Sequence, residues 1–207
     1  MGLMRKFLNQ TRKPEGFLGK LMLRGMNPGH AALADWGFTH LPPITPFRIA
    51  ELGCGGGRNA GALLSRYPQA HVTAVDYSAL SIEKAKAYNK AQIAAGRCTV
   101  LQRDVSELRL PEGAFDLAAA FETVYFWPGL ETCFVQVAGI LKPGGLFLIC
   151  NESDGKDEAG TKYEGVISGM KCYTAEQLEA ALKAAGFSEV KSAHHDSKPW
   201  ITVLAKK

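Results

Sequence analysis

Long apolar runs are missing from this sequence. No stretch approaches about 18 uninterrupted apolar residues, the length that a membrane-spanning helix needs. The first residues, Met-Gly-Leu-Met-Arg-Lys, are not followed by a long apolar core, so we expect no secretory signal. The five cysteines are scattered and form no C-x-x-C pair, which argues against a disulfide framework or a zinc site. We therefore expect no membrane span, no metal centre and a cytoplasmic protein.

Acidic residues are scarce in the first 30 positions, where six Lys and Arg side chains stand against Glu15 alone. The chain of 207 residues has a formal net charge of +4, so the remainder carries 4 − 5 = −1. A protein that binds nucleic acid usually spreads basic residues over a docking face. Basic residues confined to one segment predict a solvated arm, or a contact with an acidic partner or substrate, and we expect no nucleic-acid partner.

Strand-like and helix-like segments alternate over most of the chain. Strands alternating with helices favour a parallel sheet that is covered on both faces. The last two predicted strands are joined by a short polar turn, which predicts a hairpin. We expect an α/β fold with a doubly wound, Rossmann-like, seven-stranded sheet in three α/β/α layers, mostly parallel, with a C-terminal antiparallel hairpin. The predicted strands are 47–52, 71–75, 99–102, 115–121, 146–150, 189–194 and 200–205, and the predicted helices are 58–67, 78–94, 130–141 and 174–185.

Glycine is abundant, and four of the five residues from Gly53 to Gly57 are glycines between a predicted strand and a predicted helix. Glycine allows tight turns and close approach of a ligand to the backbone, and the N–H groups at a helix start favour anionic or carboxylate groups. A dinucleotide motif G-x-G-x-x-G beginning at Gly53 would need glycine at position 58, where Arg58 stands. A phosphate loop G-x-x-x-x-G-K beginning at Gly53 would also need glycine at position 58, so the sequence excludes this motif too. The pattern predicts a ligand-binding loop without a pyrophosphate or triphosphate cradle.

Two carboxylates follow the next two predicted strands. Asp76 ends the second strand, 76 − 53 = 23 residues after the first glycine, where a carboxylate can accept both hydrogen bonds from a ribose diol. Asp104 and Val105 follow the third strand, where they could pair with an exocyclic amine of adenine and pack on its ring. Each aspartate could instead be an ordinary turn or helix-capping residue.

Together these motifs resemble the class I S-adenosylmethionine-dependent methyltransferases over about residues 45–150. The resemblance implies that S-adenosylmethionine is the cofactor and S-adenosylhomocysteine its product, with Glu51 and the glycine loop on the methionine part, Asp76 on the ribose, and Asp104 and Val105 on the adenine. The matching segments are Glu51-Leu52-Gly53-Cys54-Gly55-Gly56-Gly57, Asp76, Arg103-Asp104-Val105, Phe121-Glu122-Thr123 and Leu141-Lys142-Pro143-Gly144-Gly145. The predicted cofactor contacts are Glu51, Gly53, Cys54, Gly55, Asp76, Tyr77, Asp104, Val105 and Glu122.

The acceptor is expected over the ends of the fourth and fifth strands. Glu122 could contact the cofactor or act as a base, and Tyr125 and Trp127 could wall the pocket, attract a cation or simply pack at a helix start. His30 could be a base near neutral pH, although a lone histidine is more often structural or solvated. The predicted catalytic residues are therefore Glu122, Tyr125 and His30.

These patterns divide the chain into a helical cap or lid at 1–46 and a cofactor-binding domain at 47–207. Within that domain, residues 151–173 form a lid-like polar insertion. The predicted activity is methyl transfer to a small-molecule acceptor by in-line displacement, and the chain is expected to be a monomer or a homodimer. Two alternatives stay open: an NAD-dependent oxidoreductase, and a non-catalytic cofactor-binding regulator with the same fold.

Overall fold

The computed structural model of the protein describes residues 7–19, 21–22 and 30–207. Arg5, Lys6, Lys20 and Arg24 of the basic segment lie outside the described residues, as do residues 26–29 of the predicted 1–46 cap. A single seven-stranded sheet has the order β3-β2-β1-β4-β5-β7-β6. Its strands are β1 Arg48–Leu52, β2 His71–Asp76, β3 Cys98–Gln102, β4 Phe115–Phe121, β5 Leu141–Asn151, β6 Glu189–His194 and β7 Ile201–Lys206.

The predicted topology is confirmed. All pairings among β1 to β5 are parallel, whereas β7 is antiparallel to both β5 and β6. The strand order reverses at β1, which lies between β2 and β4, so the carboxyl ends of these strands form the crevice where doubly wound folds bind ligands. The helices are α3 Ala31–Phe38, α4 Arg58–Arg66, α5 Ala79–Tyr88, α6 Lys90–Ala94, α7 Leu130–Ile140, α8 Glu158–Val166 and α9 Ala175–Ala184, with the 3-10 turns η1 Asn9–Thr11, η2 Val105–Glu107 and η3 Val124–Phe126.

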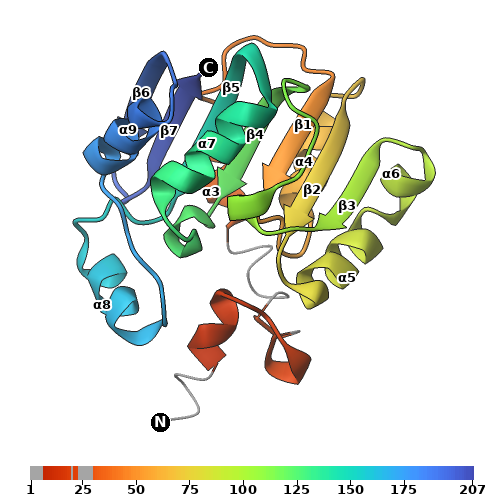
Figure 1. The fold of residues 1–207 in the computed structure, drawn as a ribbon. Coiled ribbons are helices and arrows are strands. Elements are labelled where there is room, and N and C mark those ends of the chain that lie inside the picture. Colours follow the sequence, from red (N-terminus) through yellow and green to blue (C-terminus); the bar gives the residue numbers. More distant parts are fainter. Residues whose placement is uncertain (1–6, 20, 23–29) are drawn as a thin grey trace.

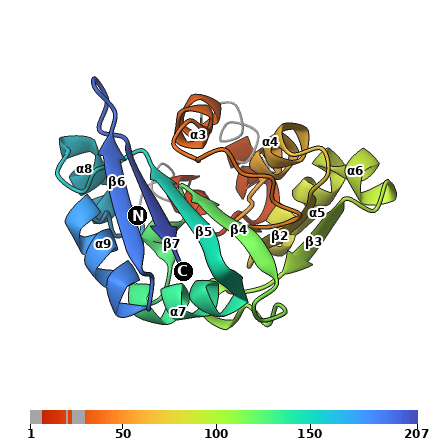
Figure 2. The same ribbon diagram turned by 90° about the horizontal axis from the view of Figure 1, so that it is seen from above.

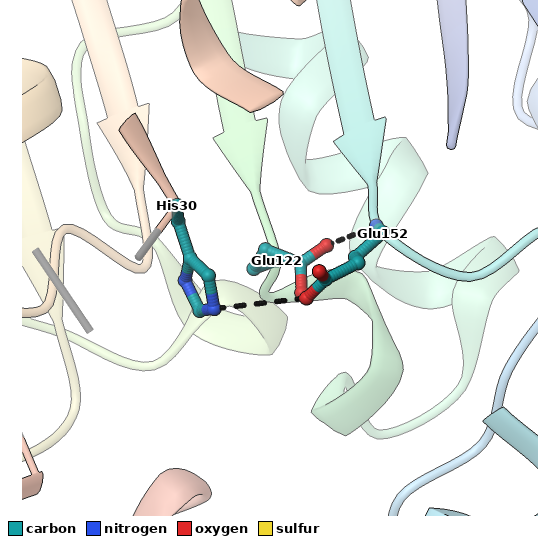
Figure 3. A group of neighbouring side chains, drawn as sticks. All are labelled: His30, Glu122 and Glu152. Carbon is teal, nitrogen blue, oxygen red and sulfur yellow. Dashed lines mark hydrogen bonds and ion pairs between the residues drawn. The ribbon is translucent and has the colours of Figure 1, made fainter. Parts of the chain in front are cut away.

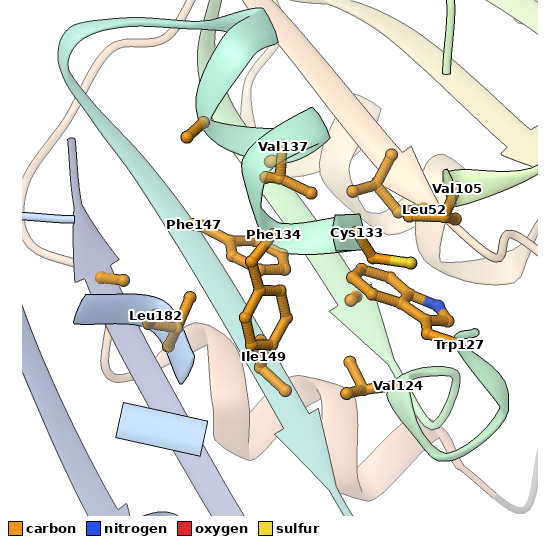
Figure 4. Close-up of a cluster of buried hydrophobic side chains, with 14 of the residues drawn as sticks. Leu52, Val105, Val124, Trp127, Cys133, Phe134, Val137, Phe147, Ile149 and Leu182 are labelled. Carbon is orange, nitrogen blue, oxygen red and sulfur yellow. The ribbon is translucent and has the colours of Figure 1, made fainter. Parts of the chain in front are cut away.

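Helices cover both faces of the sheet, so the three-layer expectation is also confirmed (Figures 1 and 2). Successive residues of β4 point to opposite faces: Ala118 and Ala120 pack with α7 and α9, whereas Leu117 and Ala119 pack with α3, α4 and α5. Figure 4 shows the core under α7, where the Trp127 indole stacks on the Phe147 ring with centroids 6.1 Å apart. Among the described residues, no helix is long and apolar enough to cross a membrane.

The structure differs from the predicted secondary structure in two places. The single helix expected at 78–94 is two helices, α5 and α6, because the buried Asn89 amide donates to the carbonyl oxygens of Gly57 at 2.9 Å and Ala85 at 3.1 Å. An asparagine side chain that competes for backbone carbonyls in this way interrupts a helix. The polar insertion is partly ordered as α8, whose first turn is capped by Asp157 accepting from the Gly160 N–H at 2.7 Å.

The helix before the hairpin begins as its sequence predicts. Thr174 accepts from the Gln177 N–H at 3.3 Å, and the Gln177 side chain accepts from the Thr174 N–H at 3.0 Å, which completes a capping box for α9. This cap orients α9 over the hairpin face of the sheet, where Leu178 and Leu182 are fully buried.

Candidate active site

The glycine loop turns sharply between β1 and α4. Gly53, Gly55 and Gly57 have positive φ values of 81°, 49° and 83°, which favour glycine. A Cβ on Gly53 would lie 2.1 Å from Thr123 Oγ1, so the close approach of the loop to the end of β4 requires glycine there. The Gly55 N–H donates to Asp76 Oδ2 at 2.9 Å, which joins the loop to the end of β2.

A cavity of about 300 Å³ opens beside this loop; we call it the glycine-loop pocket. Its walls come from the loop and from the segments that follow β2, β3 and β4, together with Thr11, Arg12, Pro14 and His30. Most of the predicted cofactor contacts line it, namely Gly53, Cys54, Gly55, Asp76, Tyr77, Asp104, Val105 and Glu122. These eight predicted contacts therefore lie around one cavity, whereas Glu51 does not line it.

Asp76 is nearly buried and already holds two backbone N–H groups. Its Oδ1 accepts from the Ser78 N–H at 2.8 Å, and its Oδ2 accepts from the Gly55 N–H at 2.9 Å. Burial raises the pKa of Asp76 above its ordinary value, and these hydrogen bonds oppose the rise. Each carboxylate oxygen has a further lone pair, so a hydroxyl group in the pocket can still be bound.

The two residues after β3 also have structural partners. Asp104 Oδ1 accepts from the Ser106 N–H at 2.9 Å and from the Ser106 hydroxyl at 2.6 Å, and so caps η2. Val105 is buried and packs in the core under α7 while it lines the pocket. Both of the roles that the sequence left open for Asp104 are thus available: the side chain caps a turn and also faces the pocket.

Glu51 lies beneath the loop, 2 % exposed, and does not itself line the pocket. Burial, and then the nearby Asp76, raise the pKa of Glu51 to about 8. Its Oε2 is buried without a hydrogen-bond partner. A buried carboxylate oxygen in this state favours a cationic or donor group brought in by a ligand.

Glu122 and Glu152 lie together at the ends of β4 and β5, with His30 beside them (Figure 3). Tyr125 is bonded to Glu122 and belongs to the same polar cluster. The Tyr125 hydroxyl donates to Glu122 Oε1 at 3.1 Å, and the Glu152 N–H donates to the same oxygen. The Ser153 N–H donates to the Tyr125 oxygen at 2.9 Å. His30 Nε2 lies 3.9 Å from Glu152 Oε2.

Burial sets the protonation preferences of this cluster. It raises the pKa of Glu122 to about 8, with a contribution from the charge of Glu152 and opposition from the two hydrogen bonds. It raises the pKa of Tyr125 well above the ordinary value and lowers the pKa of His30, against the attraction of Glu152. The cluster therefore favours a neutral imidazole and a carboxyl group that can gain or lose a proton near neutral pH.

A second cavity, of about 650 Å³, lies between α8, the first described residues and the hairpin turn; we call it the α8 cavity. It shares Thr11, His30, Glu122 and Phe126 with the glycine-loop pocket, so the two cavities adjoin at these residues. Most of the remaining lining is apolar or aromatic and comes from Phe7, Leu8, Met22, Tyr125, Tyr163, Ile167, Met170, Pro199 and Trp200.

Comparisons with known proteins agree with this geometry. A protein-family model described as a methyltransferase domain matches residues 49–145. The sterol 24-C-methyltransferase of Yarrowia lipolytica is 25% identical over 171 residues, which cover 76% of this chain and 45% of that protein. The 24-methylenesterol C-methyltransferase 3 of Arabidopsis thaliana is 26% identical over 167 residues, 74% and 46% of the two chains. Residues 49–145 therefore form a class I S-adenosylmethionine-dependent methyltransferase domain.

Solved structures share the fold of this methyltransferase domain. Human N-acetylserotonin methyltransferase in complex with S-adenosylmethionine has a TM-score of 0.75 at 17% identity, covering 90% of this chain and 55% of that one. A chain from the complex between the Haloferax volcanii Trm112 methyltransferase activator and a methyltransferase has a TM-score of 0.80 at 18% identity, covering 89% and 93%. The matched region spans less than half the length of the sterol relatives.

The residues of the methyltransferase domain fit S-adenosylmethionine. The unpartnered Glu51 Oε2 lies beneath the loop on which the methionine part is expected, and that part carries an ammonium group. The glycine-loop turn leaves no room for a Cβ at Gly53. Arg58 stands where a dinucleotide-binding motif has its third glycine, and its side chain forms an ion pair with Asp35 at 2.9 Å. The loop therefore lacks the glycine that a pyrophosphate-binding turn has at this position.

Sequence reasoning missed Glu152. It directly follows β5, as Glu122 directly follows β4, and parallel neighbours bring both ends to one edge of the sheet. The same rule that selected Glu122 could have selected it. The ligand atoms of His30, Glu122 and Glu152 lie within 4.8 Å of one another, so these three side chains could also hold a divalent cation.

Proposed function

We propose that the methyltransferase domain transfers a methyl group to a small-molecule acceptor whose body is largely apolar. The observation that carries this proposal is the junction of the two cavities at His30 and Glu122. An acceptor whose body fills the apolar α8 cavity would direct its reactive end toward the glycine-loop pocket. The names of the two relatives point to sterols, which are apolar acceptors, and support the same class.

In this proposal the predicted cofactor contacts keep their roles. Gly53, Cys54 and Gly55 border the methionine part. Glu51 lies buried beneath the loop with an unpartnered Oε2, and its charge, when ionised, would attract the ammonium group without lining the pocket. Asp76 and Tyr77 border the ribose, and Asp104 and Val105 the adenine. When bound, S-adenosylmethionine supplies a methyl group on a positively charged sulfur, which makes that carbon electrophilic.

Glu122 is the proposed proton acceptor. A hydroxyl or amine acceptor arrives protonated, and the Glu122 carboxylate would accept that proton. The bound cofactor would supply the methyl group and would leave as neutral S-adenosylhomocysteine, which keeps the electrons of the broken sulfur–carbon bond. The raised pKa of Glu122, about 8, makes the carboxylate a stronger base than an ordinary glutamate. Tyr125 would hold the carboxylate through its 3.1 Å hydrogen bond, and His30 would border the acceptor at the cavity junction.

The segments that cover the two cavities support the proposed lids. Residues 7–19 and 21–22, which we call the N-terminal arm, border both cavities through Thr11. On one side the Tyr77 hydroxyl donates to the Arg12 carbonyl oxygen, and on the other the Ser168 N–H donates to Asn9 Oδ1 at 2.8 Å. We propose that this arm, within the 1–46 cap, closes together with the 151–173 insertion over the 47–207 domain.

Two further expectations belong to the same proposal. All five cysteines are free and buried, which supports a reducing, cytoplasmic environment. A small-molecule acceptor needs no second chain to complete the site, which is compatible with a monomer or a homodimer.

The proposal is tested with apolar compounds that carry one hydroxyl, amine or alkene group, by measuring S-adenosylhomocysteine formation. Glu122→Gln should lower kcat for a hydroxyl acceptor by about 10²–10⁴-fold, the usual contribution of a general base. The exposed Glu112→Gln is the matched control and should leave kcat unchanged. Turnover only with charged, fully polar compounds would contradict an apolar acceptor, and normal turnover of Glu122→Gln would exclude Glu122 as the base.

A further inference from the structure

The α8 cavity has an acidic lining where it meets the glycine-loop pocket. Three carboxylate side chains line it, from Glu122, Glu152 and Asp157. Among the described residues of this lining, Lys198 is the single lysine or arginine. Glu122 lies at the junction of the two cavities, and Glu152 lies beside it (Figure 3). An apolar cavity with this charge at its junction favours a ligand that is apolar in its body and cationic at one end.

Glu152 carries the charge that a ligand can reach. Asp157 caps the first turn of α8, and Glu122 accepts from the Tyr125 hydroxyl at 3.1 Å. Among the described residues, the one basic side chain within 4 Å of the Glu152 carboxylate is His30, at 3.9 Å. Burial lowers the pKa of His30 and favours its neutral imidazole, so within that part of the chain the Glu152 charge has no cationic partner. The Glu152 side chain is 57% exposed, which makes it accessible to a ligand in the cavity.

Aromatic rings form much of the remaining wall. Tyr125, Phe126, Tyr163 and Trp200 all line the α8 cavity. The face of an aromatic ring attracts a cation, and the attraction strengthens where water is excluded. The structure contains one such contact on this wall, because the Lys198 ammonium lies 3.8 Å from the centroid of the Trp200 ring. Lys198 is exposed, so solvent screens its repulsion of a second cation.

We propose that the acceptor is an amine, whose ammonium group binds the Glu152 carboxylate at the junction and whose apolar body fills the α8 cavity. This inference rests on the proposed function and narrows its acceptor from a hydroxyl, amine or alkene to an amine. Glu152 is then the residue that selects the acceptor, while Glu122 keeps its role as the base. An uncharged hydroxyl or alkene on the same body gains much less from the Glu152 charge, which is the basis of the selection.

The amine must lose a proton before it can react, because an ammonium nitrogen has no lone pair. Its positive charge, close to Glu122, favours the ionised carboxylate, which then accepts the proton. The lone pair left on nitrogen bonds to the methyl carbon, and the electron pair of the broken sulfur–carbon bond stays on sulfur. The methylated nitrogen is again positively charged, so the Glu152 carboxylate faces a cation both before and after the transfer.

Calorimetry with matched compounds tests this selection without turnover. The probes are octylamine beside octanol and phenethylamine beside phenethyl alcohol, each added to the full chain with S-adenosylhomocysteine at neutral pH. Both amines are ionised there, since an alkylamine loses its proton only at about pH 10. Each amine should bind at least about tenfold more tightly than its alcohol, the usual scale for a hydrogen bond to a charged group.

Glu152→Gln removes the charge but keeps the size of the side chain. It should weaken the binding of both amines about tenfold and leave the binding of both alcohols unchanged. The exposed Glu112→Gln, outside both cavities, is the matched control and should bind the amines like wild type. Octanoate, the matched anion, should bind more weakly than octylamine, and Lys198→Gln should not weaken amine binding. Thermal unfolding verifies that each variant is folded.

Three results would overturn the inference: alcohols that bind as tightly as their amines, a Glu152→Gln variant that binds the amines like wild type, or octanoate that binds more tightly than octylamine and loses its binding in Lys198→Gln. The last would indicate an anionic acceptor.

Measuring S-adenosylhomocysteine formation separates this failure from a failure of the proposed function. Turnover of the alcohols but not of the amines would overturn the inference and leave the proposed function standing. No binding and no turnover with any apolar compound would contradict both.

Discussion

At the scale of single residues, Gly53 is the position where the loop can least tolerate a side chain. Its φ of 81° disfavours alanine, and a Cβ would also lie 2.1 Å from Thr123 Oγ1. Gly96→Ala is the matched control, because Gly96 has a similar φ of 70° and no atom within 4 Å of its Cβ position. Gly53→Ala should lower the free energy of unfolding by about 1–3 kcal/mol more than Gly96→Ala, measured by chemical denaturation. Equal losses of unfolding free energy in the two variants would show that the contact with Thr123 does not destabilise Gly53→Ala.

The second residue-scale prediction concerns Glu51, whose pKa is raised to about 8 from an ordinary 4.5. Between these values the unfolded chain loses this proton while the folded chain retains it, so the free energy of unfolding falls as the pH rises from about 5 to 8. The slope from one such group is at most about 1.4 kcal/mol per pH unit. Glu51→Gln should flatten the slope in denaturation measured across this range without cofactor, and the exposed Glu112→Gln should leave it unchanged. An unaltered slope in Glu51→Gln would exclude Glu51 as its source.

At the scale of elements, the arm is held against the end of β2 by two side-chain hydrogen bonds. The Tyr77 hydroxyl donates to the Arg12 carbonyl oxygen, and the Ser78 hydroxyl donates to the Pro14 carbonyl oxygen at 3.0 Å. Tyr77→Phe removes one of them without changing the ring, so the arm should open more often and S-adenosylmethionine should dissociate several-fold faster in stopped-flow displacement. Tyr67→Phe, outside both cavities, is the control. Equal dissociation rates in wild type and Tyr77→Phe would mean that the arm does not gate the pocket.

Elements differ in how far local sequence predicts them. The loop at Gly53 and the cap at Thr174 are local patterns, and the structure contains both. The break at Asn89 depends on the Gly57 carbonyl, 32 residues away, and the contact of Glu122 with Glu152 depends on the pairing of β4 with β5. Such contacts have no signature in a short window, because they exist only once the strands have paired.

At the scale of the whole molecule, the first 46 residues contain two parts with different roles. The arm borders the cavities, whereas α3 packs into the face of the sheet: Leu33 and Phe38 are buried, and a Cβ on Gly37 would lie 2.1 Å from Cys150 Sγ. Losing α3 would expose this face over β4 and β5, and burial of each large apolar side chain contributes about 1.5–3 kcal/mol. Residues 31–207 should therefore unfold cooperatively on heating, whereas residues 47–207 should be unstable and prone to aggregation. A shorter fragment that unfolds at the same temperature as residues 31–207 would place the domain boundary at 47, and loss of folding in both would assign a structural role to the arm as well.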